Sequence, residues 1–303
     1  MAKITLGLPY KGSKAAIAED IVKKLPPGGR ILDACCGGGA FLMAAAMSLK
    51  WDSVVGNDLN KATIKLLDAV LIHKGQIDYE HPAPCSRVDF FHSLQRIENG
   101  DFDIQDCVNK YCASFGNDGK TYLYGEQIED YKLIAEKMLT APTLSERRSN
   151  YRKFFEIMTK EDDDGRLQKL EFVQRLQSLE RLERLERLDI FDIDYKGFDV
   201  VYFDPPYKGT NKYDFEFDYD RFYDLFKSLK TDLKINAFLS EYDAPFTCVA
   251  EIEKTQLMAA SVGSSKSTTM EKLFFNGTAD EYRELIGRFY DDGAQKDCQQ
   301  SLF

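Results

Sequence analysis

A short apolar strand, a glycine-rich turn and an apolar helix follow one another near the start of this 303-residue chain. Arg30-Ile31-Leu32-Asp33 has the pattern of the strand, residues 34–39 that of the turn, and residues 40–49 that of the helix. This succession opens a Rossmann-like unit, in which glycines let the backbone approach a ligand closely. We therefore expect an α/β fold with a ligand site where this first strand ends.

The turn favours a cationic ligand over a pyrophosphate. Asp33 ends the strand with a negative charge, and Leu42 stands where the third glycine of a dinucleotide-binding pattern belongs. Both features disfavour an NAD-dependent oxidoreductase. S-adenosylmethionine carries a sulfonium and an amino group but no phosphate, so it suits a site that contains Asp33, Gly37 and Gly39.

A second short strand, residues 53–57, is followed by Asp58, which lies 19 residues past Gly39. That spacing is close to the one expected for a carboxylate that accepts hydrogen bonds from ribose hydroxyls. The alternative is that Asp58 caps a helix that begins after it. Asn60 is a second candidate for that cap, and a cap at Asn60 would leave Asp58 to the ligand.

Asp204-Pro205-Pro206-Tyr207 follows another apolar run, residues 198–203, which reads as a buried strand. The prolines fix φ at two consecutive positions and stiffen the turn. The Asp204 carboxylate and the Pro205 carbonyl are acceptors, and Tyr207 offers a ring for stacking. This set suits the exocyclic amino group of a planar base. A proline-rich turn with a core tyrosine is the plainer alternative.

With these two motifs in this order and a long insert between them, the chain resembles the Dam-like (D12 class) adenine-specific DNA methyltransferases. Residues 8–14 look like the family's N-terminal motif, and Asp194-Tyr195 looks like its Asp-aromatic pair. Residues 240–242 and 271–273 resemble late strands of the catalytic sheet. Cys35 departs from the pattern, because the family usually has an aromatic residue there.

The resemblance implies a Rossmann-like S-adenosylmethionine-dependent methyltransferase sheet with an inserted, mostly helical DNA-recognition domain. We expect residues 1–74 and 186–303 to form the catalytic domain, and residues 75–185 to form the target-recognition domain with a linking helix. The implied activity is site-specific methyl transfer to N6 of a flipped adenine in double-stranded DNA. Cytosine-N4 methylation and a non-catalytic nucleic-acid-binding protein on the same fold are the alternatives.

The predicted site residues fall into three groups. The catalytic group is Asp204, Pro205, Pro206 and Tyr207. The cofactor-binding group is Tyr10, Lys14, Asp33, Gly37, Gly39, Asp58, Asp194 and Tyr195. The DNA-binding group is Lys11, Arg147, Arg148, Arg152, Lys153 and Tyr213.

The insert carries two charge patterns of its own. Residues 131–160 hold seven Lys and Arg against three Asp and Glu, although the whole chain has a net charge of −10. Bases alternate with aromatics there, which suits DNA contacts and a solvated helix face about equally. Leucines recur every three residues from Leu176 to Leu188, with favourable i,i+4 pairs Glu180–Arg184 and Glu183–Arg187. We expect a charge-laced helix that links the insert back to the catalytic domain.

Other classes of protein find little support. His81 with Cys85, and residues 162–165, lack the further ligands that a metal site needs, so no metal is expected. No apolar run is long enough to span a membrane, and the seven cysteines suit free thiols in a reducing cytoplasm. The expected location is the cytoplasm of a bacterial or phage-infected cell. A cognate restriction endonuclease is left open as a partner.

Overall fold

A computed structural model describes most of the chain: residues 6–73, 84–126, 128–141, 143–157, 182–207, 217–258 and 265–287. The chain clusters into two compact units. Unit 1 comprises Met1–Leu6, Lys14–Leu59 and Glu180–Phe303, and unit 2 comprises Gly7–Ser13 and Asn60–Leu179. Residues 60–73 thus cluster with unit 2, although they fall within the predicted catalytic domain, which extends to residue 74.

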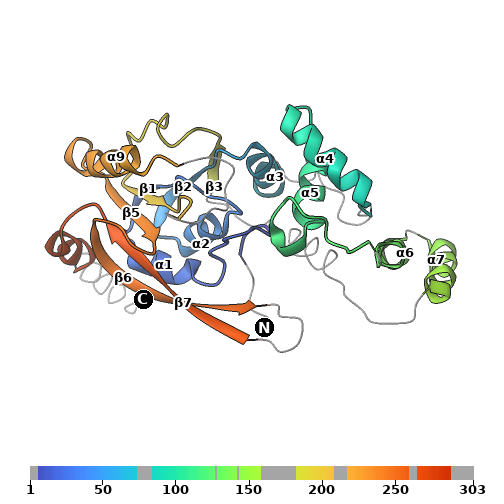
Figure 1. Ribbon diagram of the computed structural model, residues 1–303. Helices are drawn as coiled ribbons and strands as arrows, with labels where there is room; N and C mark the ends of the chain where they lie inside the picture. Colours follow the sequence, from blue (N-terminus) through green and yellow to red (C-terminus); the bar gives the residue numbers. More distant parts are fainter. Residues whose placement is uncertain are drawn as a thin grey trace, which may run out of the picture. The chain divides into compact units, whose positions relative to one another are not determined.

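Unit 1 is built on a seven-stranded sheet in the order β3-β2-β1-β4-β5-β7-β6. The pairs β2/β3, β1/β2, β1/β4 and β4/β5 are parallel, whereas β7 runs antiparallel to both β5 and β6. Figure 1 shows this sheet with helices along it. The strands are β1 (Gly28–Asp33), β2 (Trp51–Asn57), β3 (Leu182–Glu186), β4 (Val200–Phe203), β5 (Asn236–Glu241), β6 (Thr247–Met258) and β7 (Ser265–Phe275).

The strand order reverses at β1. This strand pairs with β2 on one side and with β4 on the other, and Asp33 at its end lies opposite Gly56 and Tyr202. Such a reversal is the topological switch point of an open α/β sheet, and ligands bind outside the carboxyl ends of the strands there. The fold therefore places the predicted cofactor turn and the predicted catalytic corner next to each other.

Both faces of the sheet are covered at β4. Successive residues of this strand point in opposite directions, and each meets a different helix. Tyr202 stacks on Phe41 of α2 (Ala40–Ser48), with ring centroids 3.9 Å apart. Phe203 meets Phe222 of α9 (Tyr219–Thr231) edge to face, with ring centroids 5.2 Å apart. Coverage of both faces by helices explains why β4 reads as an unbroken apolar run in the sequence.

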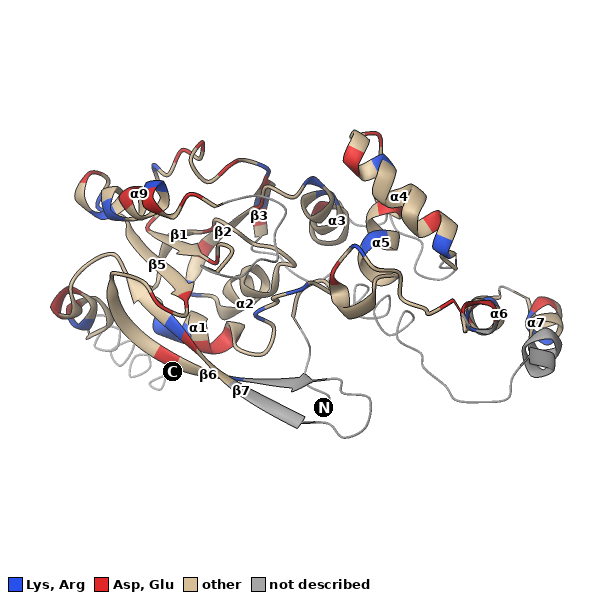
Figure 2. Ribbon diagram, in the orientation of Figure 1, with Lys and Arg blue, Asp and Glu red and all other residues tan. Residues whose placement is uncertain are grey.

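The helices of unit 1 follow from their sequences. α1 (Ala18–Lys24) begins with acidic residues and ends with Lys23 and Lys24, which suits the helix dipole (Figure 2). α2 is apolar throughout, and its residues from Ala40 to Ala46 are all buried. α9 is capped by Asp218, whose side chain accepts a hydrogen bond from the backbone N–H of Arg221.

The predicted linking helix over residues 176–188 is wrong where the structure describes it. Leu182–Glu186 forms β3, a strand parallel to β2, and residues 176–181 lie outside the described part. Glu183 bonds Ser53 of β2 and the Arg30 side chain instead of an Arg one helical turn away. Pairing with β2 gives the backbone of this charged segment the hydrogen bonds that the predicted helix would have supplied.

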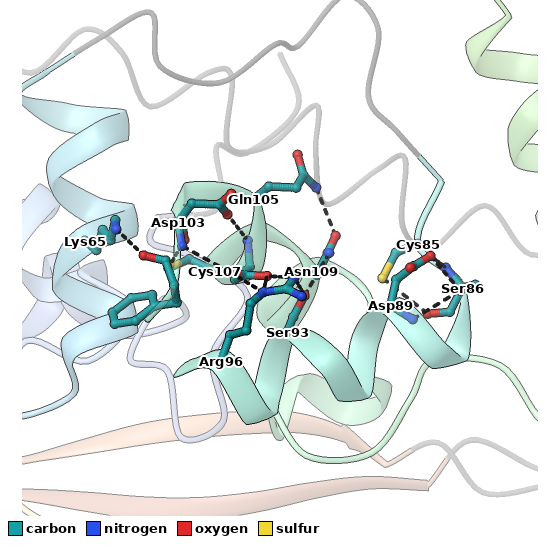
Figure 3. A network of polar contacts seen from close by, with 12 residues as sticks. Lys65, Cys85, Ser86, Asp89, Ser93, Arg96, Asp103, Gln105, Cys107 and Asn109 are labelled. Carbon is teal, nitrogen blue, oxygen red and sulfur yellow. Dashed lines mark hydrogen bonds and ion pairs between the residues drawn. The ribbon is translucent and has the colours of Figure 1, made fainter. Parts of the chain in front are cut away.

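Unit 2 is mostly helical in its described part, as predicted for the insert. Its helices are α3 (Lys61–Leu71), α4 (Arg87–Asn99), α5 (Ile104–Cys112), α6 (Glu129–Thr140) and α7 (Leu144–Ile157), with a short 3₁₀ turn η1 (Phe115–Asn117). Capping boxes begin α4 at Ser86 and α5 at Asp103. Figure 3 shows the polar contacts that join these two helices, including Asn109 Nδ2 to Ser93 Oγ at 3.1 Å.

Candidate active site

The glycine-rich turn after β1 is anchored to the end of β2. The backbone N–H of Cys36 donates to the carbonyl of Asn57 at 2.8 Å. The Asn57 side chain in turn donates to the carbonyls of Ala34 and Leu188. Gly37 and Gly39 have φ of 47° and 77°, a left-handed conformation that favours glycine. The turn is therefore a fixed feature that depends on its glycines.

The carboxyl group of Asp33 is buried without a good hydrogen-bond partner in the described part of the chain. Its exposure is 1%, and no described residue donates a well-formed hydrogen bond to either carboxylate oxygen. Burial raises the pKa of Asp33 well above its ordinary value, and the carboxylates of Asp204 and Asp58 raise it further. A ligand that brings hydrogen-bond donors and a positive charge would suit such a buried carboxyl group.

Asp58 follows β2 and faces the turn. Its Oδ2 accepts a hydrogen bond from the backbone N–H of Gly37 at 2.8 Å. The helix cap is Asn60, whose side chain accepts from the N–H groups of Ala62 and Thr63 at the start of α3. The choice that the sequence left open is settled in favour of Asn60, so Asp58 is not used as the cap.

Asp204 lies at the carboxyl end of β4, directly after Phe203, and it is paired with a lysine. Lys14 Nζ donates to both Asp204 carboxylate oxygens, at 2.6 and 2.8 Å. Burial raises the pKa of Asp204, and the Lys14 ammonium opposes that rise. Burial likewise lowers the pKa of Lys14, but Asp204 and Glu271 raise it more. Their geometry is that of a close, largely buried lysine–carboxylate pair.

The rest of the corner is held by aromatic hydroxyls. Tyr219 of α9 donates to the carbonyl of Pro206, and Tyr207 donates to the carboxylate of Glu271 in β7. The ring of Tyr207 meets Tyr242 edge to face, with ring centroids 4.7 Å apart. Among the described residues, none donates a hydrogen bond to the carbonyl of Pro205. As far as the described residues go, the Pro205 carbonyl can therefore accept a hydrogen bond from a ligand.

Glu271 and Lys254 also belong to this site, although neither is among the site residues predicted from the sequence. Glu271 Oε1 lies 3.5 Å from Lys14 Nζ, and both Glu271 and Lys254 are buried. The signal that could have found Glu271 is its place in β7, where it shares the buried face with Leu273 and Phe275. A charge at a core-facing position of an alternating strand needs a partner or a function.

The predicted Asp-aromatic pair lies before β4. Asp194 is exposed, and its carboxylate accepts a hydrogen bond from the backbone N–H of Lys196 at 3.1 Å. Tyr195 packs in the core with its hydroxyl donating to the carbonyl of Ile190. The buried ring fixes the backbone beside Asp194. A contact of either residue with the cofactor stays a prediction.

The remaining predicted residues lie in unit 2 or outside the described part. Tyr10 and Lys11 cluster with unit 2, where the ring centroid of Tyr10 lies 6.0 Å from that of Tyr111. Arg147 and Arg148 are exposed on α7, next to Glu146. Arg152 and Lys153 continue α7, without described side chains, and Tyr213 lies outside the described residues.

The described residues contain no group of histidine, cysteine and acidic side chains that could hold a metal ion. His81 and residues 162–165 lie outside the described part. Cys85, which was weighed with His81 as a metal ligand, is buried, and its thiol faces the carbonyl of Ser86. The described helices also include none with the length and apolar character needed to cross a bilayer.

The reversed strand order, the glycine turn and the two acidic residues at the switch point define a Rossmann-like sheet with a ligand site there. A family model described as D12 class N6 adenine-specific DNA methyltransferase matches residues 10–270. The chain belongs to this family, and it is an adenine DNA methyltransferase that acts on DNA. The resemblance seen in the sequence is thereby confirmed.

Solved structures give distant likenesses. Two structures of the rRNA methyltransferase aviRa from Streptomyces viridochromogenes are each 14% identical, with TM-scores of 0.36 and 0.34. They cover 91% and 86% of this chain and 91% and 82% of their own. A structure of SMU.472 complexed with SAH is 15% identical, has a TM-score of 0.31, and covers 87% of this chain and 53% of its own. No curated protein sequence matches the chain.

Proposed function

We propose that this chain transfers a methyl group from S-adenosylmethionine to N6 of an adenine that is flipped out of duplex DNA at a specific site. The observation that carries the proposal is the contrast between two carboxylates at the switch point. Asp33 is buried without a good partner, whereas Asp204 is paired with Lys14. The first suits a cationic cofactor, and the second suits a substrate amino group that takes over the place of the ammonium.

The residues of the turn fit S-adenosylmethionine. The Asp33 carboxylate would accept hydrogen bonds from a ligand ammonium and compensate its charge. Asp58 would accept from ribose hydroxyls beside the bond it already accepts from Gly37. Asp194, with Tyr195 buried behind it, would face the adenine of the cofactor. When bound, the cofactor supplies an electrophilic methyl group on its sulfonium, which becomes a thioether as N6 gains the methyl group and releases one proton to solvent.

The corner at Asp204 would activate the amino group of the target base. The lone pair of adenine N6 is delocalised into the ring, which makes it a poor nucleophile. Hydrogen bonds from N6 to the Asp204 carboxylate and the Pro205 carbonyl favour a more tetrahedral nitrogen. The ionised Asp204 also stabilises the positive charge that develops on N6. Holding N6 in line with the methyl group supplies much of the rate.

Access to N6 requires that the base leave the duplex. Unstacking and unpairing cost a few kcal/mol. Stacking of the base on Tyr207 would recover about 1–3 kcal/mol of this cost. Pro206 helps to hold the ring in place, because its carbonyl is fixed by the hydroxyl of Tyr219.

Unit 2 would read the DNA sequence. Its exposed Arg147 and Arg148, together with Arg152 and Lys153 farther along α7, would contact phosphates or base edges. Lys11 and Tyr213 are the other proposed DNA contacts. The domain boundaries proposed for this role are residues 75–185, and the cluster that contains α3 begins earlier, at Asn60.

The test uses the full chain, duplex DNA of mixed sequence and methyl-labelled S-adenosylmethionine. Digestion of the labelled DNA to nucleosides is expected to place the label in N6-methyladenosine. Label in N4-methylcytosine would replace the proposal with the cytosine reaction. Absence of label, with DNA still bound in a filter assay, would identify a non-catalytic DNA-binding protein. Mapping the modified adenines would give the recognised sequence.

A further inference from the structure

Glu271 lies deep beside the catalytic corner, outside both sequence motifs. It accepts the hydroxyl hydrogen bond of Tyr207, and its Oε1 lies 3.5 Å from Lys14 Nζ. Its exposure is only 2%. One carboxylate thus contacts both the ring proposed to stack on the base and the lysine paired with Asp204.

A second lysine comes from the neighbouring strand. Lys254 of β6 lies on the same face of the β6–β7 pair as Glu271, because Ile252 is the residue opposite Glu271 and side chains alternate along a strand. Lys254 is buried, and burial and the Lys14 charge lower its pKa, whereas Glu271 and Asp204 raise it. The corner therefore contains the carboxyl groups of Asp204 and Glu271 and two lysines, and Asp33 lies close to Asp204.

The paired state of Asp204 raises a question about substrate binding. Both of its oxygens now accept hydrogen bonds from Lys14. The amino group of adenine needs one of these acceptors, so Lys14 must give up part of its contact. A buried ammonium that loses a close carboxylate partner is destabilised unless another carboxylate replaces it. Glu271 lies close enough to Lys14 to take over the pairing with a small movement of the lysine side chain.

We propose that Glu271 is a positioning residue for methyl transfer: it holds Tyr207 by its hydroxyl and receives Lys14 when the adenine amino group binds Asp204. The proposal rests on the function proposed above and extends it to a residue of the β6–β7 pair. Tyr207 remains a donor across the working pH range, because burial and the nearby Asp204 and Glu271 raise its pKa. The ring is therefore fixed at both ends, by the rigid proline turn and by Glu271.

The charge of Glu271 has a consequence for the pH dependence of the reaction. Glu271 raises the pKa of Lys14 and that of Asp204. Replacing it with glutamine keeps an acceptor for Tyr207 but removes the charge, so both pKa values fall. The acid limb of the rate profile, set by ionisation of Asp204, and the alkaline limb, set by loss of the Lys14 proton, then both move to lower pH. The charged and titratable groups at the corner are Lys14, Lys254, Asp204, Glu271, Asp33, Tyr202 and Tyr207.

The experiment measures kcat and kcat/KM for duplex DNA against pH at saturating S-adenosylmethionine. Wild type is compared with Glu271→Gln and with Glu253→Gln, a matched control that removes an exposed carboxylate from β6. For E271Q we expect about a tenfold loss of kcat, both limbs moved to lower pH, and cofactor affinity within about twofold of wild type. E253Q is expected to match wild type. Loss of rate in E271Q with unmoved limbs would overturn the proposal.

Two further variants cover the case in which E271Q does not fold, as judged by near-ultraviolet circular dichroism. Glu271→Asp retains the charge, so its limbs should stay at the wild-type positions while kcat falls. Tyr207→Phe keeps the ring and every charge, and it should lower kcat severalfold without moving either limb. An unchanged kcat in Y207F, or limbs that move in E271D, would overturn the proposal. If wild type itself forms no N6-methyladenosine, the proposed function fails; if wild type is active and E271Q equals it, only this inference fails.

Discussion

The two carboxylates that end β1 and β4 have similar surroundings but opposite pairing. Asp33 and Asp204 follow adjacent parallel strands at the switch point of the sheet. Asp33 is buried without a good partner among the described residues, whereas Asp204 accepts two hydrogen bonds from Lys14. The same chemical group is thus left open at one strand end and neutralised from within the protein at the other.

The difference matches the kind of ligand that each carboxylate would meet. A cofactor that carries its own positive charge supplies the missing counterion of Asp33 when it binds, so an internal lysine there would compete with it. Adenine is neutral, and it offers only the weak dipole of an amino group. Burial raises the pKa of Asp204 and the Lys14 ammonium opposes that rise, so the lysine favours the ionised form of Asp204 until the base arrives.

The largest effect is expected from removal of the Asp204 carboxylate. Asp204→Ala should lower kcat by about 10³-fold or more, because N6 loses both its acceptor and the stabilising charge. Cofactor affinity should stay within about threefold of wild type, since Asp33 and Asp58 are intact. Calorimetry and the labelled-DNA assay measure the two quantities. An active D204A enzyme would remove the distinction between the two carboxylates.

Replacement of Lys14 by an uncharged residue would leave Asp204 without its lysine partner, as Asp33 already is. Lys14→Met should lower the free energy of unfolding by about 2–3 kcal/mol at neutral pH, because it leaves a partly buried carboxylate unpaired. The pKa of Asp204 rises once the ammonium that lowers it is gone, so the acid limb of the rate profile should move to higher pH. Denaturant unfolding and a pH series of kcat/KM measure both effects.

Lys24→Met is the matched control for Lys14, because Lys24 is exposed at the end of α1. It should leave both stability and the rate profile near wild type. An acid limb that stays in place in K14M would mean that Lys14 does not control the ionisation of Asp204.

Removal of the charge of Asp33 should change the free energy of unfolding in the direction opposite to K14M when no cofactor is bound. Asp33→Asn should raise the free energy of unfolding by about 1–3 kcal/mol at a pH above the folded-state pKa of Asp33, because it removes an uncompensated buried charge. It should also weaken S-adenosylmethionine binding by about tenfold to a hundredfold. The pair of measurements, stability without cofactor and calorimetric affinity, sharpens the comparison because K14M and D33N move stability in opposite directions.

The pH dependence of the D33N effect follows from the pKa of Asp33, which lies above its ordinary value of 3.8 in the folded protein. A raised folded-state pKa contributes stability that is fully present below 3.8 and is lost as the pH rises through the folded-state pKa. The advantage of D33N should therefore vanish at acid pH and reach its full size above that pKa. A difference that stays constant with pH would show that Asp33 is not buried as an anion.

The strands, the turn and the helix next to the two motifs could be predicted from the sequence, because short local patterns determine them. The strand before Asp33, the turn through Gly39, the apolar α2 and the strand before Asp204 all depend on apolar runs, glycines and prolines within about ten residues of one another. The topological switch then follows from a Rossmann-like order, which places both acids at one edge of the sheet.

The remaining features depend on contacts between distant parts of the chain. β3 forms in a segment whose leucine spacing suggested a helix, because pairing with β2 overrides local propensity. Lys14 was predicted to bind the cofactor, but its side chain meets Asp204, 190 positions away. Glu271 was read only as part of a strand, and its contact with Tyr207 becomes visible only once the strands are assembled.

The smallest expected effect separates Asp58 from Asn60, which the sequence offered as alternative caps for α3. Asp58→Ala removes the acceptor for the Gly37 N–H and the proposed ribose contact, so it should raise the dissociation constant of S-adenosylmethionine about fivefold to tenfold. Its kcat at saturating cofactor should be unchanged. Asn60→Ala removes the cap and should cost about 1 kcal/mol of stability, with cofactor affinity unaltered. If N60A weakens cofactor binding and D58A does not, the acidic side of the site ends at Asp33, and Asp58 serves only to hold the turn.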